Sequence, residues 1–245
     1  MSLAWPVYQL GATDSTNSEA KRRVSAGRFA DSWLVAESQS AGRGRLQKNW
    51  ISPAGNLFST ALFREPGGLV VASRMPFASA LAVNDVALLF APEADVRLKW
   101  PNDVRIDRAK LSGILIETGG SGADTWVAAG IGINVLHVPD GAGQPATSIA
   151  TLRKDSAVTA DMALEALRKA FAERLLQARQ GFDGLRKDWL DRAEGLGGTV
   201  RVTTSGAPVE GVFEDMDMSG GLVLRLPDGS RQTIRAGDVD LIGRA

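Results

Sequence analysis

The sequence contains no cysteine and only one histidine, His137. The lack of cysteine excludes a thiolate nucleophile, a disulfide framework and a zinc ribbon, and a lone histidine excludes the HExxH zinc pattern. Charge of one sign is not in excess either, because 28 Lys and Arg balance 28 Asp and Glu. A neutral chain has no overall field that would hold it on nucleic acid or an anionic membrane. We therefore expect any anion-binding site to be local, with neither DNA nor a membrane as a partner.

Long apolar runs are missing as well. The first residues, Met-Ser-Leu-Ala-Trp-Pro, lack the positive segment and apolar stretch of a secretory signal, and no window approaches about 18 uninterrupted apolar residues. Two common nucleotide-binding fingerprints, GxGxxG and GxxxxGKS/T, do not occur. The sequence predicts a soluble, cytoplasmic protein in which any nucleotide is held by another scaffold.

Apolar periodicity gives the expected secondary structure. It predicts helices over 17–26, 75–90 and 161–180, and strands over 33–37, 57–63, 97–100, 112–117 and 126–135. Ser15 and Thr16 are suited to cap the first helix, and Gly27 is suited to end it. Because strands and helices mix without regular alternation, we expect an α+β fold with a mixed or antiparallel sheet.

The composition changes near residue 195. Beyond this point the chain is rich in glycine, contains no lysine and has more acidic residues than arginines. Short alternating stretches predict antiparallel strands, curled into a small barrel, over 199–204, 209–213, 221–226 and 232–234. We therefore predict two domains, 1–195 and 196–245. The acidic balance of the second domain argues against a barrel that binds nucleic acid.

One stretch, 37–53, contains three cations spaced by glycines, Arg43, Arg45 and Lys48, with no acid after its first residue. Glycine lets the backbone approach phosphate oxygens closely, and arginine presents a planar fork to carboxylate or phosphate. This pattern is typical of a loop that binds a polyanion, although a solvated basic turn has the same composition. Because the cations repel one another when no anion lies between them, we expect residues 40–49 to be mobile without ligand.

Two further stretches have patterns that suit a binding site. The first, 97–117, contains Lys-Trp-Pro-Asn-Asp followed by Lys-Leu-Ser-Gly-Ile-Leu-Ile-Glu. It predicts a short hairpin with Lys110 at the mouth of an apolar strand, which would give a catalytic cation rigid support. An ordinary hairpin with a surface lysine has the same pattern. The second, 129–134, is apolar with two glycines, which indicates either a bulge or a strand that a ligand or backbone approaches closely.

Together these stretches resemble the biotin protein ligase family. The family pattern has five blocks, which occur here in the same order: Ser-Thr-Asn at 15–17, the Gly-Arg loop at 39–53, Lys-Trp-Pro-Asn-Asp at 99–103, Lys-Leu-x-Gly-Ile-Leu-x-Glu at 110–117 and Gly-Ile-Gly-Ile-Asn at 130–134. Five blocks in order are specific, whereas one alone is weak. This chain differs in the loop, where Gln47-Lys48 replaces the second Gly-Arg. Lysine keeps the charge of that position but lacks the fork.

The resemblance implies a ligase-type catalytic domain with a mixed sheet, followed by a small SH3-like β-barrel. Because Ser-Thr-Asn begins at residue 15, it implies the form without an N-terminal DNA-binding domain. It also implies two half-reactions. Biotin and ATP, with Mg²⁺ bound to the ATP, give biotinyl-5′-AMP and pyrophosphate, and the biotinyl group then passes to a lysine of a biotin carboxyl carrier protein domain. A homodimer is compatible with the resemblance.

The resemblance also assigns residues to the site. The implied catalytic residues are Lys110, Arg43, Arg45 and Asp103, with Lys110 between the biotin carboxylate and the α-phosphate and Asp103 orienting Lys110 or accepting a proton from the incoming lysine. The implied biotin-binding residues are Ser15, Thr16, Asn17, Gln39, Gly42, Arg43, Lys110, Gly113 and Gly130; among these, Gly113 and Gly130, together with Gly132, leave room for the bicyclic ring. The implied ATP-binding residues are Arg45, Lys48, Trp50, Asn102 and Asn134. No residue is assigned to a metal.

Two alternatives stay open from the sequence. Lipoate ligases and octanoyl transferases belong to the same superfamily, but the sequence lacks the Arg-Arg-x-Ser-Gly-Gly-Gly stretch of those ligases. A non-catalytic module that binds anions or RNA explains the Gly-Arg loop. It does not explain the Lys110 hairpin or the polar residues Ser15 and Gln39.

Overall fold

The computed structural model describes residues 4–139, 141, 143–153 and 158–242. Its centre is a seven-stranded sheet of order β1-β3-β5-β9-β8-β7-β6. These strands are β1 (Val7–Gln9), β3 (Ser32–Ala36), β5 (Leu57–Arg64), β9 (Trp126–Ile133), β8 (Ala109–Gly119), β7 (Asp103–Ile106) and β6 (Val96–Lys99). Only the β1 and β3 pair is parallel, so the sheet is mixed, as predicted. Two short strands, β2 (Ala12–Thr13) and β4 (Ser38–Gln39), form a separate parallel pair.

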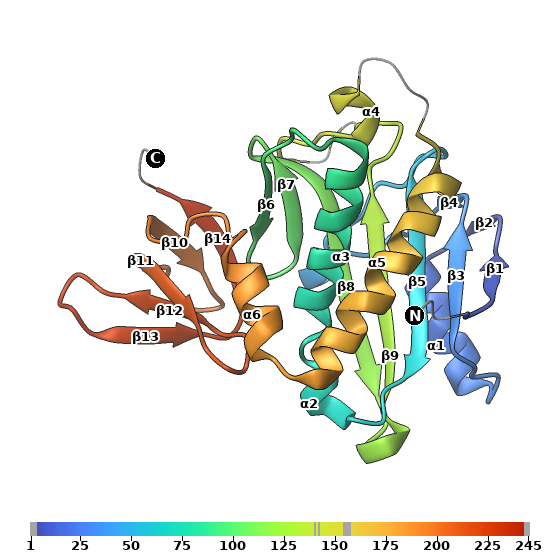
Figure 1. The fold of residues 1–245 in the computed structure, drawn as a ribbon, viewed down its shortest axis with the longest axis horizontal. Coiled ribbons are helices and arrows are strands. Elements are labelled where there is room, and N and C mark those ends of the chain that lie inside the picture. The colour runs from blue at the N-terminus through green and yellow to red at the C-terminus, as the bar shows by residue number, and fades with distance from the viewer. Residues whose placement is uncertain (1–3, 140, 142, 154–157, 243–245) are drawn as a thin grey trace.

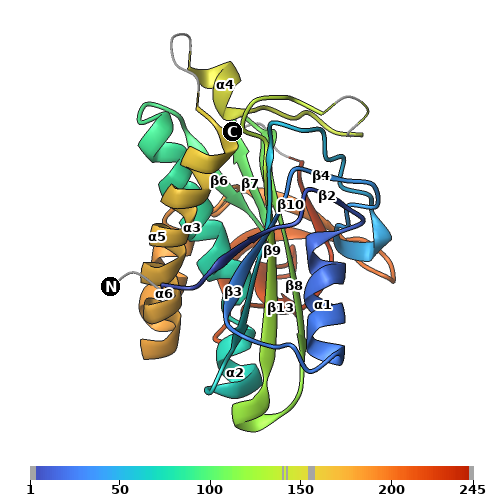
Figure 2. The same cartoon turned by 90° about the vertical axis from the view of Figure 1, so that its right-hand side faces the viewer.

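Helices cover both faces of this sheet. The long helices α3 (Met75–Phe90) and α5 (Ala160–Gln180) lie on one face, and α1 (Thr16–Ser25) lies on the other (Figures 1 and 2). The shorter helices are α2 (Gly68–Ala72), α4 (Ile149–Leu152), α6 (Asp183–Leu190) and the 3-10 turns η1 (Arg45–Gln47) and η2 (Gly122–Asp124). The layered arrangement confirms the expected α+β class.

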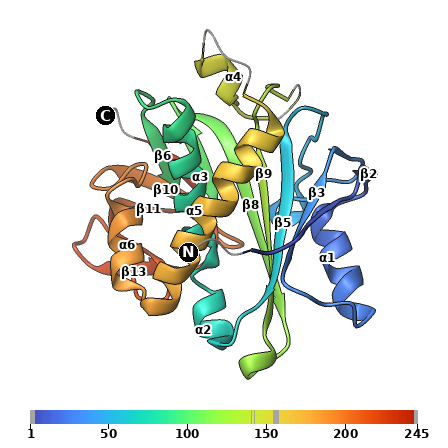
Figure 3. The same ribbon diagram turned by 45° about the vertical axis from the view of Figure 1, so that its right-hand side comes forward.

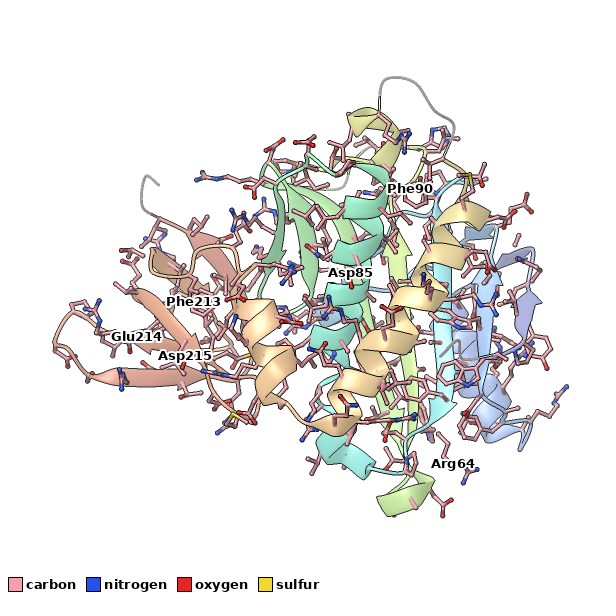
Figure 4. All side chains as sticks on the ribbon, in the orientation of Figure 1. Arg64, Asp85, Phe90, Phe213, Glu214 and Asp215 are labelled. Atoms are coloured by element: carbon pink, nitrogen blue, oxygen red, sulfur yellow. The ribbon has the colours of Figure 1, made fainter. Side chains whose placement is uncertain are left out.

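Helix α3 is the central helix of the core. The stretch 68–90 that contains it is long and apolar enough to cross a membrane, yet 67% of its most apolar window is buried inside the protein. One polar group, Asp85, faces outward from α3 (Figure 4) and accepts two hydrogen bonds from the Arg174 guanidinium of α5. Arg174 also pairs with Asp188 of α6, at 2.8 Å. These ion pairs join the three helices, and the burial of α3 is that of a core helix.

The C-terminal residues form a second, antiparallel sheet of order β13-β12-β11-β10-β14. Its strands are β10 (Thr199–Thr203), β11 (Val209–Met216), β12 (Leu222–Arg225), β13 (Arg231–Ile234) and β14 (Asp238–Leu241). Within residues 199–242, no backbone pairing joins the end strands β13 and β14, so barrel closure stays a prediction. The division into domains at 195/196 also stays a prediction.

Direct contacts fix the second sheet against the first part of the chain. The Trp100 indole Nε1 donates to the Gly220 carbonyl at 3.0 Å. Gly220 has a φ of +84°, and a Cβ there would lie 2.5 Å from the Phe77 ring of α3, so a side chain would clash. Helix α6 lies beside the second sheet (Figure 3), where Arg186 donates to the Met216 carbonyl. The position of β14 relative to the first sheet is therefore set by packing.

The expected long elements are present, with small shifts of their ends. Helix α3 has the predicted bounds, and the other two helices begin one residue early. The expected cap of α1 is wrong in detail, because the Ser15 side chain makes no capping hydrogen bond. Instead, the Gln39 side-chain oxygen accepts from the Thr16 backbone N–H at 2.9 Å. Helix α6 and the strands β1, β2, β4, β7 and β14 were not predicted as separate elements.

Candidate active site

A cavity of about 690 Å³ opens between the sheet, the start of α1, the Gly-Arg loop and the edge of β14. Every residue that the sequence assigned to the site lines this cavity except Gly42. A Cβ at Gly42 would lie 2.2 Å from the Trp50 carbonyl oxygen and 2.7 Å from the Ser52 Oγ, so glycine is needed where the two sides of the loop approach. Gly42 therefore shapes the loop in this structure, and its assignment to biotin stays a prediction.

Lys110 and Asp103 face each other in this cavity. The Lys110 Nζ lies 2.8 Å from the Asp103 Oδ1, and both side chains are largely buried. A bulge in β8 at Leu111, opposite β7, explains the geometry. Because one extra residue reverses the alternation of a strand, Lys110 and Gly113 face the same side although they are three residues apart. Leu111 faces the core with no exposed area.

Trp50 packs against β8 and β9. A Cβ at Gly113 would lie 2.8 Å from its ring, and a Cβ at Gly132 would lie 2.6 Å from it. The ring centre is 5.4 Å from the Lys110 Nζ, within cation–π range. The glycines of these two strands therefore make room for Trp50 in this structure, and they also line the cavity, so the expectation that they leave space for biotin stays a prediction. At Gly130 the space is taken by Asn17, whose Oδ1 is 2.2 Å from the position of a Cβ.

A polar network surrounds the first turn of α1. The Gln39 Oε1 accepts from the Thr16 backbone N–H, and the Gln39 Nε2 donates to the Ser52 Oγ at 2.9 Å. The buried Thr60 hydroxyl lies 2.6 Å from the Asn17 Oδ1 and 2.8 Å from the Thr16 Oγ1. The network fixes amide and hydroxyl groups in place, next to the buried Ser15. Such neutral donors and acceptors suit an uncharged polar ligand.

The two ends of the Gly-Arg loop are held by acids from other elements. The Arg43 Nη2 lies 2.7 Å from the Glu117 Oε1, and Glu117 also accepts from Asn17 and Lys21. Burial favours the neutral form of Glu117, but the hydrogen bonds from Arg43 and Asn17 outweigh it, and its pKa lies below the usual value. At the other end, the Lys48 Nζ lies 3.0 Å from the Asp238 Oδ2.

These ion pairs correct the premise that the loop cations face no anion. Arg45, between them, donates to the Asn102 Oδ1 and to the Gly237 carbonyl, each at 3.4 Å. Burial lowers the pKa of the Arg45 guanidinium, and the nearby charges of Asp103 and Asp238 act in the opposite direction. Arg43 and Lys48 are thus each paired with an acid, whereas Arg45 donates to neutral oxygens.

Asn134 mainly donates hydrogen bonds to backbone carbonyls of neighbouring segments. Its side-chain Nδ2 donates to the Thr147 carbonyl at 3.0 Å and to the Lys110 carbonyl at 3.3 Å, and its backbone N–H donates to Leu111. Its Oδ1 is buried, and no residue of the described chain donates to it. The expected contact of Asn134 with ATP therefore has one available acceptor atom. Asn102 is similarly engaged, since its Nδ2 donates to the Ile114 carbonyl at 2.6 Å.

Three residues of the cavity region were missed from the sequence: Glu117, Lys99 and Asp238. Glu117 and Lys99 end and begin two of the motif blocks, which was a usable signal. Asp238 comes from β14, more than a hundred residues in sequence from its partners Lys99 and Lys48. Only the packing of the two sheets brings it close to them. Its pKa is about 2, because hydrogen bonds from Lys99 and Lys48 outweigh the opposing effect of burial. Among the described residues no cluster of three His, Asp or Glu forms a metal site.

Comparison with known proteins shows to which family the chain belongs. Residues 12–134 match the model of the biotin/lipoate A/B protein ligase family, and residues 195–242 match the biotin protein ligase C-terminal domain. A Paracoccus denitrificans protein named as a biotin acetyl-CoA-carboxylase ligase is 41% identical over 237 residues, which cover 94% of this chain and 98% of that protein. The chain belongs to the biotin protein ligase family.

Other relatives agree with this assignment. A similarly named Mycobacterium tuberculosis ligase is 34% identical over 233 residues, covering 93% of this chain and 85% of that protein. The biotin protein ligase of Aquifex aeolicus, solved in complex with biotin and ATP, superimposes with a TM-score of 0.79 at 25% identity and covers 96% of this chain and 98% of its own. The ligase fold predicted from the motif blocks is confirmed.

Proposed function

We propose that this biotin protein ligase joins biotin to ATP as biotinyl-5′-AMP and then transfers the biotinyl group to a lysine of a biotin carboxyl carrier protein domain. The observation that carries the proposal is the Lys110 and Asp103 pair, held at 2.8 Å inside a cavity that collects residues of all five motif blocks. Neutral polar groups, among them Thr16 and Gln39, and cations, among them Arg45 and Lys48, line the same cavity. This combination matches an uncharged ring together with phosphates.

In the first step, an oxygen of the biotin carboxylate bonds to the α-phosphorus of ATP, the bond from that phosphorus to the bridging oxygen breaks, and pyrophosphate leaves. Two anions must meet, so the site has to offset their repulsion. Lys110 can donate to both reacting groups, and Asp103 keeps its ammonium oriented. Arg43 and Arg45 would pair with carboxylate and phosphate oxygens as the loop closes. Thr16, Asn17 and Gln39 would bind the ureido ring.

In the second step, the amine of the acceptor lysine attacks the carbonyl carbon of biotinyl-AMP. An amide bond forms, AMP leaves and the amine loses a proton, for which the Asp103 carboxylate is the nearest candidate acceptor. Mg²⁺ commonly binds through substrate phosphates with one or two carboxylates, and it would supply charge neutralisation when bound with ATP. Asp103 and Asp240 line the cavity and are carboxylates that would be available for this role.

We place the catalytic domain at 1–195 and assign to 196–245 a supporting role in nucleotide binding. The contact from Arg45 to the Gly237 carbonyl and that from Lys48 to Asp238 support this role. The need for ATP and for a carboxylase carrier supports a cytoplasmic location. Light scattering of the purified chain, with and without biotin and ATP, tests for a homodimer.

Biotin-dependent exchange of labelled pyrophosphate into ATP tests the proposed function. We expect exchange with biotin, and none without it, because only a bound carboxylate can form the adenylate reversibly. Lipoate and octanoate in place of biotin test the sister activities of the superfamily. Exchange with lipoate but not with biotin would overturn the assignment, and strongly salt-dependent RNA binding without exchange would indicate a binding module instead.

A further inference from the structure

An acidic side chain of the second sheet lies among the cations of the cavity. The Asp238 Oδ1 lies 3.0 Å from the Lys99 Nζ, and the Asp238 Oδ2 lies 3.0 Å from the Lys48 Nζ. The preceding carbonyl, that of Gly237, accepts from Arg45 at 3.4 Å. Gly237 and Asp238, at the start of β14, therefore face three cations, all of which belong to the catalytic part of the chain.

The arrangement is that of an anion-binding subsite occupied by the Asp238 carboxylate. Each carboxylate oxygen takes one ammonium group, as adjacent oxygens of a phosphate would. ATP brings a polyphosphate into this cavity under the proposed function, and its terminal phosphates need cations beyond Lys110. While Asp238 holds Lys48 and Lys99, these ammonium groups are neutralised, and a phosphate at the same place would repel the carboxylate.

Burial differs between Lys48 and Lys99, and this difference determines how a phosphate can replace the Asp238 carboxylate as their partner. The Lys48 side chain is 66% exposed, so water can solvate it when its partner leaves. The Lys99 side chain is only 10% exposed, so leaving it without an anion would be costly. Asp240 also pairs with Lys99, but at 3.6 Å it is beyond hydrogen-bond distance, and its side chain is 65% exposed. Departure of Asp238 would therefore leave Lys99 with only this weaker partner unless another anion takes its place.

We propose that Asp238 is an internal substitute for the β- and γ-phosphates of ATP, holding Lys48 and Lys99 ready in the empty site and giving them up when the nucleotide binds. This inference rests on the proposed function, since it names the phosphate subsite of that reaction. When pyrophosphate forms, the returning carboxylate competes for the same lysines and favours pyrophosphate release. Asp238 acts through the lysines and is a positioning residue.

Equilibrium binding of ATP, without biotin, to the full chain tests the inference by calorimetry. Without biotin no adenylate forms, so ATP is a stable probe. The test variant is Asp238→Asn, with Asp238→Ser as a second variant should the first be poorly folded. Glu210→Gln is the matched control, because Glu210 pairs with Arg201 on the outer side of the same sheet at 2.6 Å. Pyrophosphate and AMP are the comparison ligands, each measured with and without Mg²⁺.

Removal of the competing carboxylate should make ATP and pyrophosphate bind roughly three- to tenfold more tightly, as expected for loss of partly exposed ion pairs. AMP, which lacks the terminal phosphates, and biotin should bind as they do to the parent protein. Unchanged affinity for ATP and pyrophosphate would overturn the inference, and so would weaker binding seen only with Mg²⁺, which would make Asp238 a metal ligand. A parent protein that binds no ATP at all would instead overturn the proposed function.

Discussion

The Lys110 ammonium and the Asp103 carboxylate lie 2.8 Å apart, on neighbouring strands of one hairpin. The bulge at Leu111 aims Lys110 into the cavity, and Asp103 begins β7 at the edge of the same cavity. Their side chains are 16% and 13% exposed, so each charge depends on the other for compensation. A substrate anion that approaches Lys110 therefore meets a cation that is already oriented, which is the condition for stabilising charge in a transition state.

Replacement of Lys110 by alanine should abolish adenylate formation. Loss of one preorganised donor typically lowers a rate on the order of 100- to 1,000-fold. Biotin should still bind, because the polar network around Thr16 and Gln39 does not include Lys110. Pyrophosphate exchange and calorimetric biotin binding measure the two effects. Lys169→Ala, at an exposed position of α5, is the control, and near-normal exchange in folded Lys110→Ala would remove Lys110 from the mechanism.

Replacement of Arg43 by alanine should release biotinyl-AMP from the enzyme. A charge-assisted hydrogen bond contributes about 1.5–3 kcal/mol, so retention of the adenylate should weaken by roughly 10- to 100-fold. The released anhydride would label lysines of a bystander protein such as albumin, which a streptavidin blot detects. Arg45→Ala should behave similarly.

Glu117→Gln provides the opposite test of the same loop. It frees Arg43 from its partner at 2.7 Å while keeping the guanidinium, so labelling of the bystander should stay at the parent level. If Arg43→Ala forms the adenylate and labels the bystander no more than the parent does, Arg43 does not retain the intermediate.

The sequence was most informative where chemistry is local. The apolar run of α3 and the short motif blocks can each be recognised from residues that are adjacent in the sequence. The catalytic candidates Lys110 and Asp103 were found in this way. The direction of Lys110 was not predictable in the same sense, because it depends on a bulge at Leu111 that appears only in the register of β7 and β8.

Contacts between distant segments were not accessible from the sequence. Asp238 looked like one more acid in a lysine-free tail, and the lysines it neutralises lie in the other part of the chain. The neighbours of the glycines were not predictable for the same reason. Their spacing indicates close approach, but which partner approaches, Trp50 or a ligand, is decided by the path of the loop.

Acid should remove the contribution of Asp238 to stability. Its pKa is depressed to about 2 in the folded protein, from about 3.9 when unfolded. Its ion pairs therefore stabilise the fold fully above about pH 4, and this stabilisation is lost as the pH falls through about 2. Because the Asp238 side chain is 42% exposed, we expect a contribution below about 1 kcal/mol.

Urea unfolding of the parent and Asp238→Asn at several pH values between about 2 and 6 measures this contribution. The difference in the free energy of unfolding should be constant at the upper end and shrink toward zero at the lower end. Other carboxylates titrate in both proteins and cancel in the comparison. A difference that does not change with pH would show that Asp238 contributes through packing rather than charge.

Limited digestion with trypsin should reveal how the Gly-Arg loop is held. The loop is tied at Arg43 by Glu117 and at Lys48 by Asp238, so cleavage after these two residues requires both ion pairs to open. Exposed ion pairs contribute about 0.2–1 kcal/mol each, and the double variant Glu117→Gln, Asp238→Asn should therefore be cut a few-fold to about tenfold faster. Cleavage after Arg28, in an exposed turn beyond α1, is the internal control.

Biotin and ATP together should slow loop cleavage in both proteins, because the adenylate supplies the anions that the double variant lacks. Equal cleavage of the parent and the double variant after Arg43 and Lys48, with ligand binding confirmed separately, would mean that the acids do not hold the loop.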